Sequence, residues 1–262
     1  MFWYFGYGSN MDLTSLRAKG VEPRSSERAL APGWRLCFNV QHFFRHEGGV
    51  GNIVPSPQAG DHVWGVLHQC EDQHLALLDH AEAYGHGYDR IELTLRTARG
   101  EQAAIAYVGM PSFINDACRP TQRYLNILLQ GAAAAGLDPA YIESLRRQPV
   151  HHKQPVPRFV PPPGDYPVFD DESLARHPLH TALAGSVFDM SAARAQHRFL
   201  QLAFGGKDMT LFHLKRRDRS DGRETIDDIR HDRLDDEQRR HLNEFLHEYN
   251  VEYVYAGRFE YR

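Results

Sequence analysis

Two glycines and two short polar side chains follow an apolar segment near the start of the chain, in the sequence Phe5-Gly6-Tyr7-Gly8-Ser9-Asn10. Glycine lets the backbone approach a ligand closely, and successive N–H groups in such a turn form an anion-binding hollow. A carboxylate would suit that hollow. An ordinary turn that ends a strand and binds nothing has the same pattern, so the loop alone leaves both interpretations open.

A carboxyl group near the end of an expected helix is the second candidate for chemistry. Glu82 lies in the sequence Leu78-Asp79-His80-Ala81-Glu82-Ala83-Tyr84, which leads into a glycine-rich turn. The helix dipole disfavours a negative charge at this end of a helix, and proteins use such environments to prepare carboxyl groups for proton transfer. A solvated surface glutamate would have the same local sequence.

The first half of the chain has the sequence pattern of an α+β unit, which would position the glycine loop and the segment that contains Glu82. We expect strands at residues 2–7, 63–68, 88–97 and 102–109, and helices at 71–83, from Thr121 to about 136, and from Asp138 onward. The segment 88–97 alternates apolar and polar residues, as a half-buried strand does. Because regular helices do not separate the strands, a mixed, partly closed sheet is favoured over a doubly wound parallel sheet.

The chain is expected to divide where prolines crowd between positions 149 and 167, because proline at that density prevents helix and sheet ladders. We expect a domain at residues 1–150, a proline-rich linker or surface-packed arm at 151–167, and a small α+β domain at 168–262. In that last part the pattern predicts strands at 184–189, 209–214 and 252–261, and helices at 192–204 and from Asp235 or Asp236 to about 249.

Composition excludes several classes of function. The chain has 262 residues and a formal net charge of −4, so no overall field favours nucleic acid or an anionic membrane. Cys37, Cys70 and Cys118 are scattered and odd in number, which is typical of free thiols in a reducing compartment. No segment has the pattern of a signal peptide or a membrane span. The histidines lack the spacing of a metal site. We therefore expect a cytoplasmic protein without a metal.

Several further segments occur in the order found in one known family, and together they span about 145 residues. On these segments the first half, roughly residues 1–150, resembles the γ-glutamylcyclotransferase family. They are Tyr4 to Met11, Gly33-Trp34-Arg35-Leu36, Asn52-Ile53-Val54-Pro55, Val63-Trp64-Gly65-Val66-Leu67, Leu78-Asp79 with Glu82 and Tyr88, Tyr124 with Gly131-Ala132, and Gly136 to Leu145.

The resemblance implies a small mixed β-barrel with flanking helices, no metal and no cofactor. It also implies an enzyme of the lyase or acyltransferase type that releases 5-oxoproline from a small γ-glutamyl amine or peptide. Glu82 would be the general acid/base that carries a proton from the attacking α-amine to the leaving amine. The substrate-binding residues would be Tyr4, Tyr7, Gly8, Ser9, Asn10, Tyr88 and Tyr124.

One residue departs from the family pattern. The family commonly has glycine after the catalytic glutamate, and this chain has Ala83, which is strained if the position requires a positive φ. Two alternative functions stay open: a related acyl-transfer enzyme acting on a larger γ-glutamyl-protected metabolite, and a non-catalytic carboxylate-binding module with the same fold. Residues 168–262 would either select the amine part of the substrate or serve as a docking or homodimerisation module.

Overall fold

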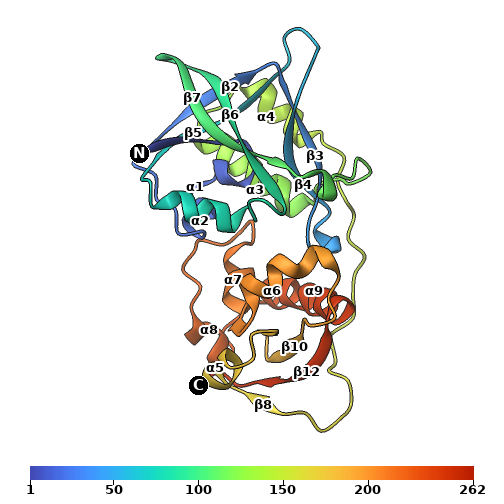
Figure 1. The fold of residues 1–262 in the computed structure, drawn as a ribbon. Helices are drawn as coiled ribbons and strands as arrows, with labels where there is room; N and C mark the ends of the chain where they lie inside the picture. The colour runs from blue at the N-terminus through green and yellow to red at the C-terminus, as the bar shows by residue number, and fades with distance from the viewer. The chain divides into compact units, whose positions relative to one another are not determined.

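The computed structural model describes all residues from Met1 to Arg262. They form two compact units (Figure 1). The first comprises Met1–His42 and Glu47–His152, and the second comprises Phe43–His46 and Lys153–Arg262. None of the helices is both long enough and apolar enough to cross a bilayer.

The first unit is built on a closed five-stranded barrel, which confirms the expected mixed α+β barrel. The strand order is β1-β5-β2-β6-β7, and the ring closes through a parallel bridge between Tyr4 and Ile105, whereas the other strand pairs are antiparallel. The barrel strands are β1 (Phe2–Gly6), β2 (Ser25–Pro32), β5 (His62–Cys70), β6 (Tyr88–Thr97) and β7 (Gly100–Gly109). A separate hairpin consists of β3 (Trp34–Gln41) and β4 (Gly49–Pro55).

Four helices accompany this barrel: α1 (Leu13–Arg17), α2 (His74–Ala81), α3 (Gln122–Ala134) and α4 (Pro139–Arg146). Thr121 and Asp138 cap α3 and α4, as the sequence predicts. Helix α3 packs directly on the turn that follows β1. A Cβ added at Gly131 would lie 2.5 Å from the backbone nitrogen of Asp12, so only glycine allows this approach. The helix thereby fixes the course of the loop after β1.

Helix α2 ends in a Schellman motif that places Glu82 at the C-cap. The N–H of Tyr84 donates to the carbonyl of Asp79 (2.8 Å), and the N–H of Ala83 donates to the carbonyl of His80 (3.2 Å). Ala83 occupies the left-handed conformation at φ 50°, where glycine is usual. The geometry that positions the Glu82 side chain is therefore maintained against local backbone strain.

The second unit contains a five-stranded sheet of order β11-β9-β10-β12-β8 with five helices. The strands are β8 (Val168–Phe169), β9 (His180–Leu183), β10 (Ser186–Asp189), β11 (Lys207–Asp208) and β12 (Val254–Phe259). The helices are α5 (Asp171–Ala175), α6 (Arg198–Phe204), α7 (Thr210–Lys215), α8 (Ile226–Arg230) and α9 (Asp236–Glu252). Its core is rich in aromatic rings; Phe44 stacks on Tyr249 with ring centroids 5.1 Å apart.

Two of the elements predicted for this unit differ in the structure. The expected strand at 209–214 is wrong, because Thr210–Lys215 forms helix α7. Its buried positions are Thr210, His213 and Leu214, which share one helical face. A segment this short does not distinguish the apolar pattern of a helix from that of a strand. The expected helix at 192–204 begins only at Arg198, after a 3-10 turn at Ala195–His197.

The proline-rich segment lies along the second unit as an extended arm. The N–H of Phe159 donates to Asn243 Oδ1 (2.7 Å), and Asn243 Nδ2 and His247 Nε2 each bond the carbonyl of Pro157 at 2.8 Å. Both of these side chains belong to α9. Backbone groups that cannot join a helix or sheet are thus satisfied by side chains of that helix.

We expect Ala83→Gly to raise the free energy of unfolding of the first unit by about 0.5–1 kcal/mol, because it removes a Cβ from a left-handed residue. Urea unfolding followed by tryptophan fluorescence measures this, since Trp3, Trp34 and Trp64 all lie in the first unit. Ala76→Gly, inside α2, is the matched control and should be destabilising. A loss of stability in Ala83→Gly would contradict the strain argument.

Asp208 gives the second unit a stability that depends on pH. Burial raises the pKa of this carboxyl from 3.8 to about 7, although hydrogen bonds from Thr210 and Tyr261 act to lower it. Its Oδ2 has no hydrogen-bond partner. The folded unit keeps the proton after the unfolded chain has lost it, so stability falls as pH rises from about 4 to about 7.

Asp208→Asn mimics the protonated acid and should remove this dependence. At pH 8 the variant should be more stable than the parent by at most a few kcal/mol, since one pKa unit corresponds to about 1.4 kcal/mol, and at pH 5 the difference should be much smaller. Urea unfolding followed by far-UV circular dichroism at both pH values checks this. An equal difference at pH 5 and pH 8 would be inconsistent with a neutral carboxyl in the folded unit.

Candidate functional site

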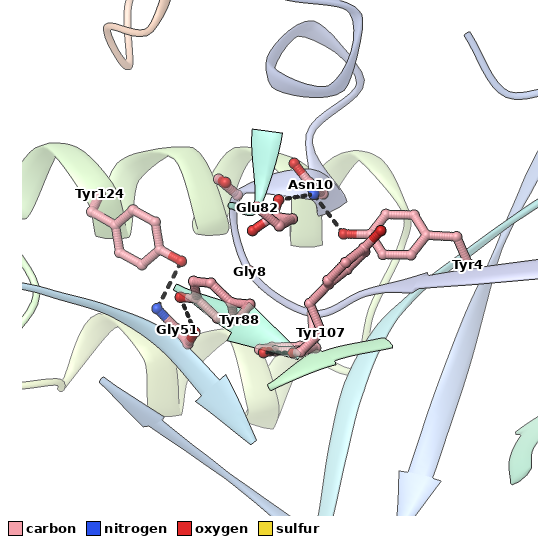
Figure 2. Close-up of a pocket in the computed structure, with 10 residues that line it drawn as sticks. Tyr4, Gly8, Asn10, Gly51, Glu82, Tyr88, Tyr107 and Tyr124 are labelled. Atoms are coloured by element: carbon pink, nitrogen blue, oxygen red, sulfur yellow. Dashed lines mark hydrogen bonds between the residues drawn. The ribbon is translucent and has the colours of Figure 1, made fainter. Parts of the chain in front are cut away.

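A single pocket in the first unit brings together the two segments that the sequence singled out (Figure 2). All eight site residues expected from the sequence line it: Tyr4, Tyr7, Gly8, Ser9, Asn10, Glu82, Tyr88 and Tyr124. Strand β1, the loop that follows it, the C-cap of α2, the start of β6 and the first turn of α3 supply them. The loop after β1 and the end of α2 are therefore neighbours in space, although about seventy residues separate them.

Two glycines make room for one phenol at the centre of the pocket. A Cβ added at Gly8 or at Gly51 would lie 2.8 or 2.9 Å from the hydroxyl oxygen of Tyr124. That oxygen accepts the N–H of Gly51 at 2.9 Å, and the backbone of Ser9 makes a second hydrogen bond to it. Burial raises the pKa of Tyr124 to about 12, against these two bonds. Tyr124 is thus a neutral phenol whose own hydrogen remains available to a ligand.

The other tyrosines divide into two kinds. The hydroxyls of Tyr7, Tyr88 and Tyr107 donate within the protein: to the carbonyl of Tyr107, to the carbonyl of Gly51 (2.9 Å) and to Asp79 Oδ1 (2.7 Å), respectively. The hydroxyl of Tyr4 instead accepts a hydrogen bond from Asn10 Nδ2. The first three phenols fix the wall of the pocket, whereas Tyr4, like Tyr124, keeps a hydrogen for a ligand.

Glu82 is held through one of its two carboxylate oxygens. Its Oε1 accepts from Asn10 Nδ2 at 2.9 Å and from Lys19 Nζ at 3.0 Å, and Lys19 Nζ also donates to Asn10 Oδ1 at 2.6 Å. The Glu82 side chain is 15% exposed and that of Lys19 is 6% exposed. The second oxygen, Oε2, has no hydrogen-bond partner among the protein groups and remains available to a proton donor on a ligand.

A buried histidine anchors the loop from the barrel side. His68 Nε2 lies 2.9 Å from the carbonyl of Asn10, and its Nδ1 lies 2.8 Å from the hydroxyl of Ser26. Burial lowers the pKa of His68 to about 4, so the ring is neutral at neutral pH. Because a carbonyl only accepts, Nε2 carries the hydrogen. His68 therefore holds the backbone of Asn10 without adding charge to the site.

Three residues of the site were not predicted from the sequence. Gly51 and Tyr107 line the pocket, and Lys19, which does not line it, donates a hydrogen bond to Glu82. A glycine inside a strand indicates a close backbone approach, which could have pointed to Gly51. Tyr107 is a polar aromatic residue in the apolar second half of β7, which is a weaker signal. Nothing in the local sequence distinguishes Lys19 from a surface lysine. No group of three or more His, Cys, Asp or Glu side chains is arranged to hold a metal ion.

Comparisons with known proteins point to one family. Residues 62–145 match the model of the AIG2-like family, a range that includes Glu82, Tyr88 and Tyr124. A γ-glutamylcyclotransferase of Mus musculus is 29% identical over 149 residues, which is 55% of this chain and 77% of the relative. A γ-glutamyl cyclotransferase of Aspergillus oryzae is 26% identical over 186 residues, 62% of this chain and 64% of the relative.

Solved structures share the fold. An uncharacterized protein of Homo sapiens has a TM-score of 0.51 at 26% identity, covering 58% of this chain and 90% of the human chain. The protein YkqA of Bacillus subtilis has a TM-score of 0.50 at 21% identity, covering 56% of this chain and 53% of its own. The family match ends at residue 145 and does not reach the second unit's Lys153–Arg262. The first half of the chain thus resembles the γ-glutamylcyclotransferases.

Proposed function

We propose that this protein is a γ-glutamylcyclotransferase-type enzyme that releases 5-oxoproline from a γ-glutamyl amine or peptide. The observation that carries the proposal is the placement of Glu82. One carboxylate oxygen is fixed by Asn10 and Lys19, and the other is left without a protein partner, in a pocket shared with the glycine loop. The names of the mouse and Aspergillus relatives agree with this activity.

The reaction joins two groups of one molecule. The α-amine attacks the γ-carbonyl, a new C–N bond closes the five-membered ring, and the original amide C–N bond breaks to release the amine. Because both reacting groups belong to the substrate, the enzyme mainly has to hold a folded conformer. The pocket, with its wall fixed by Tyr7, Tyr88 and Tyr107, suits that task.

Glu82 would handle the protons. Each proton that its free oxygen accepts from the attacking nitrogen can be returned to the departing nitrogen, so a single carboxylate serves as base and then as acid with no net proton change. The partners of Oε1 can stay in place throughout, because the transfer uses the other oxygen. No cofactor is needed for this step.

The negative charge that develops on the γ-carbonyl oxygen requires hydrogen-bond donors. The pocket offers the hydroxyl hydrogens of Tyr4 and Tyr124 and the backbone of the loop from Gly8 to Asn10. Donors that are already oriented need no rearrangement during the reaction, which is the source of their effect on rate. The α-carboxylate of the substrate would take the remaining donors.

The proposal predicts that Glu82→Gln lowers kcat by about 10²–10⁴-fold, the usual effect of losing one proton-transfer group. The assay incubates the protein with a panel of γ-glutamyl amines and peptides and measures 5-oxoproline by mass spectrometry. Glu92→Gln is the matched control, since Glu92 is an exposed glutamate of β6 in the same unit; it should keep the parental rate. A Glu82→Gln protein that releases 5-oxoproline at the parental rate would show that another group transfers the proton.

A further inference from the structure

Lys19 lies directly after α1 and bonds both polar side chains of the site from outside the pocket. It is not among the residues that line the pocket. Its Nζ donates to Asn10 Oδ1 at 2.6 Å and to Glu82 Oε1 at 3.0 Å. A lysine side chain that is only 6% exposed has given up most of its hydration, which requires compensation by such partners.

The first consequence concerns the amide of Asn10. An ammonium group only donates, and a carboxylate only accepts. With Lys19 on one side, the amide oxygen of Asn10 must face Nζ, so Nδ2 points to Glu82 and to the hydroxyl of Tyr4. Without Lys19 the amide could rotate by half a turn and set its oxygen against the carboxylate. Lys19 therefore selects the orientation in which Asn10 holds Glu82 and Tyr4.

The second consequence concerns the charge of Glu82. The carboxylate lies at the C-cap of α2, where the helix dipole opposes a negative charge. Five phenols surround it, and burial raises the pKa of each, so they are neutral: Tyr4, Tyr7, Tyr88, Tyr107 and Tyr124. On its own helix Asp79 is paired with Arg90 at 3.5 Å. The ammonium of Lys19, 3.0 Å from Oε1, is thus the cation that contacts Glu82 and offsets the unfavourable helix dipole.

We propose that Lys19 is a positioning residue that fixes the Glu82 carboxylate and the Asn10 amide before each turnover. In its catalytic part this inference rests on the proposed function. When Glu82 accepts a proton in the reaction it loses its charge, but Lys19 still bonds Asn10 Oδ1 and preserves the amide orientation for the return of the proton. Lys19 acts through these two side chains and has no contact with the reacting atoms.

The test compares Lys19→Met, which removes the charge and the donors, with Lys19→Gln, which keeps a donor without charge, and Lys19→Arg, which keeps both. Arg17→Met is the matched control, because Arg17 is an exposed cation of α1 paired with Glu22. Two readouts are used for each protein: kcat and KM for 5-oxoproline release, and the NMR signals of the Asn10 side-chain amide, assigned with Asn10→Ala.

In Lys19→Met we expect the Asn10 side-chain amide signals to shift, because the amide oxygen loses the donor that fixes its orientation. We expect kcat to fall at least about tenfold, with a smaller change in KM. Lys19→Arg should restore most of both, Lys19→Gln, whose amide can also accept, should restore neither, and Arg17→Met should match the parent.

The two readouts separate the two proposals. If the parent releases no 5-oxoproline from the panel but the Asn10 amide signals shift in Lys19→Met, the proposed function fails and the role of Lys19 in positioning stands. If the parent is active and neither the Asn10 signals nor kcat changes in Lys19→Met and Lys19→Gln, the role of Lys19 is refuted. Should Lys19→Met fail to fold, Lys19→Gln decides by the same amide signals.

Discussion

The site depends on one set of hydrogen bonds, in which a donor-only cation, an amide and a carboxylate share a small buried space. Lys19, Asn10 and Glu82 come from three separate segments, and their bonds span 2.6–3.0 Å. Neighbouring elements hold these three side chains in place. Helix α3 packs on the loop through Gly131, and His68 bonds the Asn10 carbonyl. The Schellman motif fixes the end of α2, where Glu82 lies. The strained Ala83 shows that the position of Glu82 is determined by this surrounding structure.

The sequence predicted the parts of the site that depend on local chemistry. The glycine loop and the carboxyl at a helix end were both visible as patterns, and the alternation over 88–97 gave β6 the bounds that the structure has. Contacts made only by tertiary folding could not be read in this way. Lys19 bonds Glu82, which is sixty-three residues away in the sequence. Position 51 requires glycine because the hydroxyl of Tyr124 lies against it. The short segment that forms α7 has an apolar pattern compatible with a helix or a strand, and in the folded protein it is a helix.

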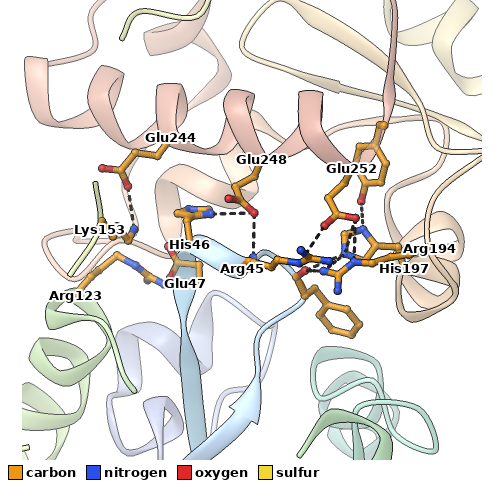
Figure 3. Close-up of polar contacts among 12 residues, drawn as sticks. Arg45, His46, Glu47, Arg123, Lys153, Arg194, His197, Glu244, Glu248 and Glu252 are labelled. Atoms are coloured by element: carbon orange, nitrogen blue, oxygen red, sulfur yellow. Dashed lines mark hydrogen bonds and ion pairs between the residues drawn. The ribbon is translucent and has the colours of Figure 1, made fainter. Parts of the chain in front are cut away.

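The second unit includes four residues that sequence patterns did not assign to it, Phe43–His46. Phe44 is 2% exposed in its core, and Arg45 and His46 pair with Glu252 and Glu248 of α9 (Figure 3). Arg194 and Lys153 bind the same row of glutamates at Glu252 and Glu244. A cut after residue 150 would therefore leave Phe44 without its core, so the two units are best studied in the full chain.

The central claim is that the pocket holds a γ-glutamyl group with its α-amine at Glu82. A crystal structure of Glu82→Gln with a γ-glutamyl dipeptide tests this directly, because the substitution removes the base and leaves the pocket in place. The account predicts the α-nitrogen within hydrogen-bond distance of the side chain at position 82 and the γ-carbonyl oxygen facing Tyr124 or the loop backbone. A dipeptide bound with its α-carboxylate against position 82, or bound outside this pocket, would contradict it.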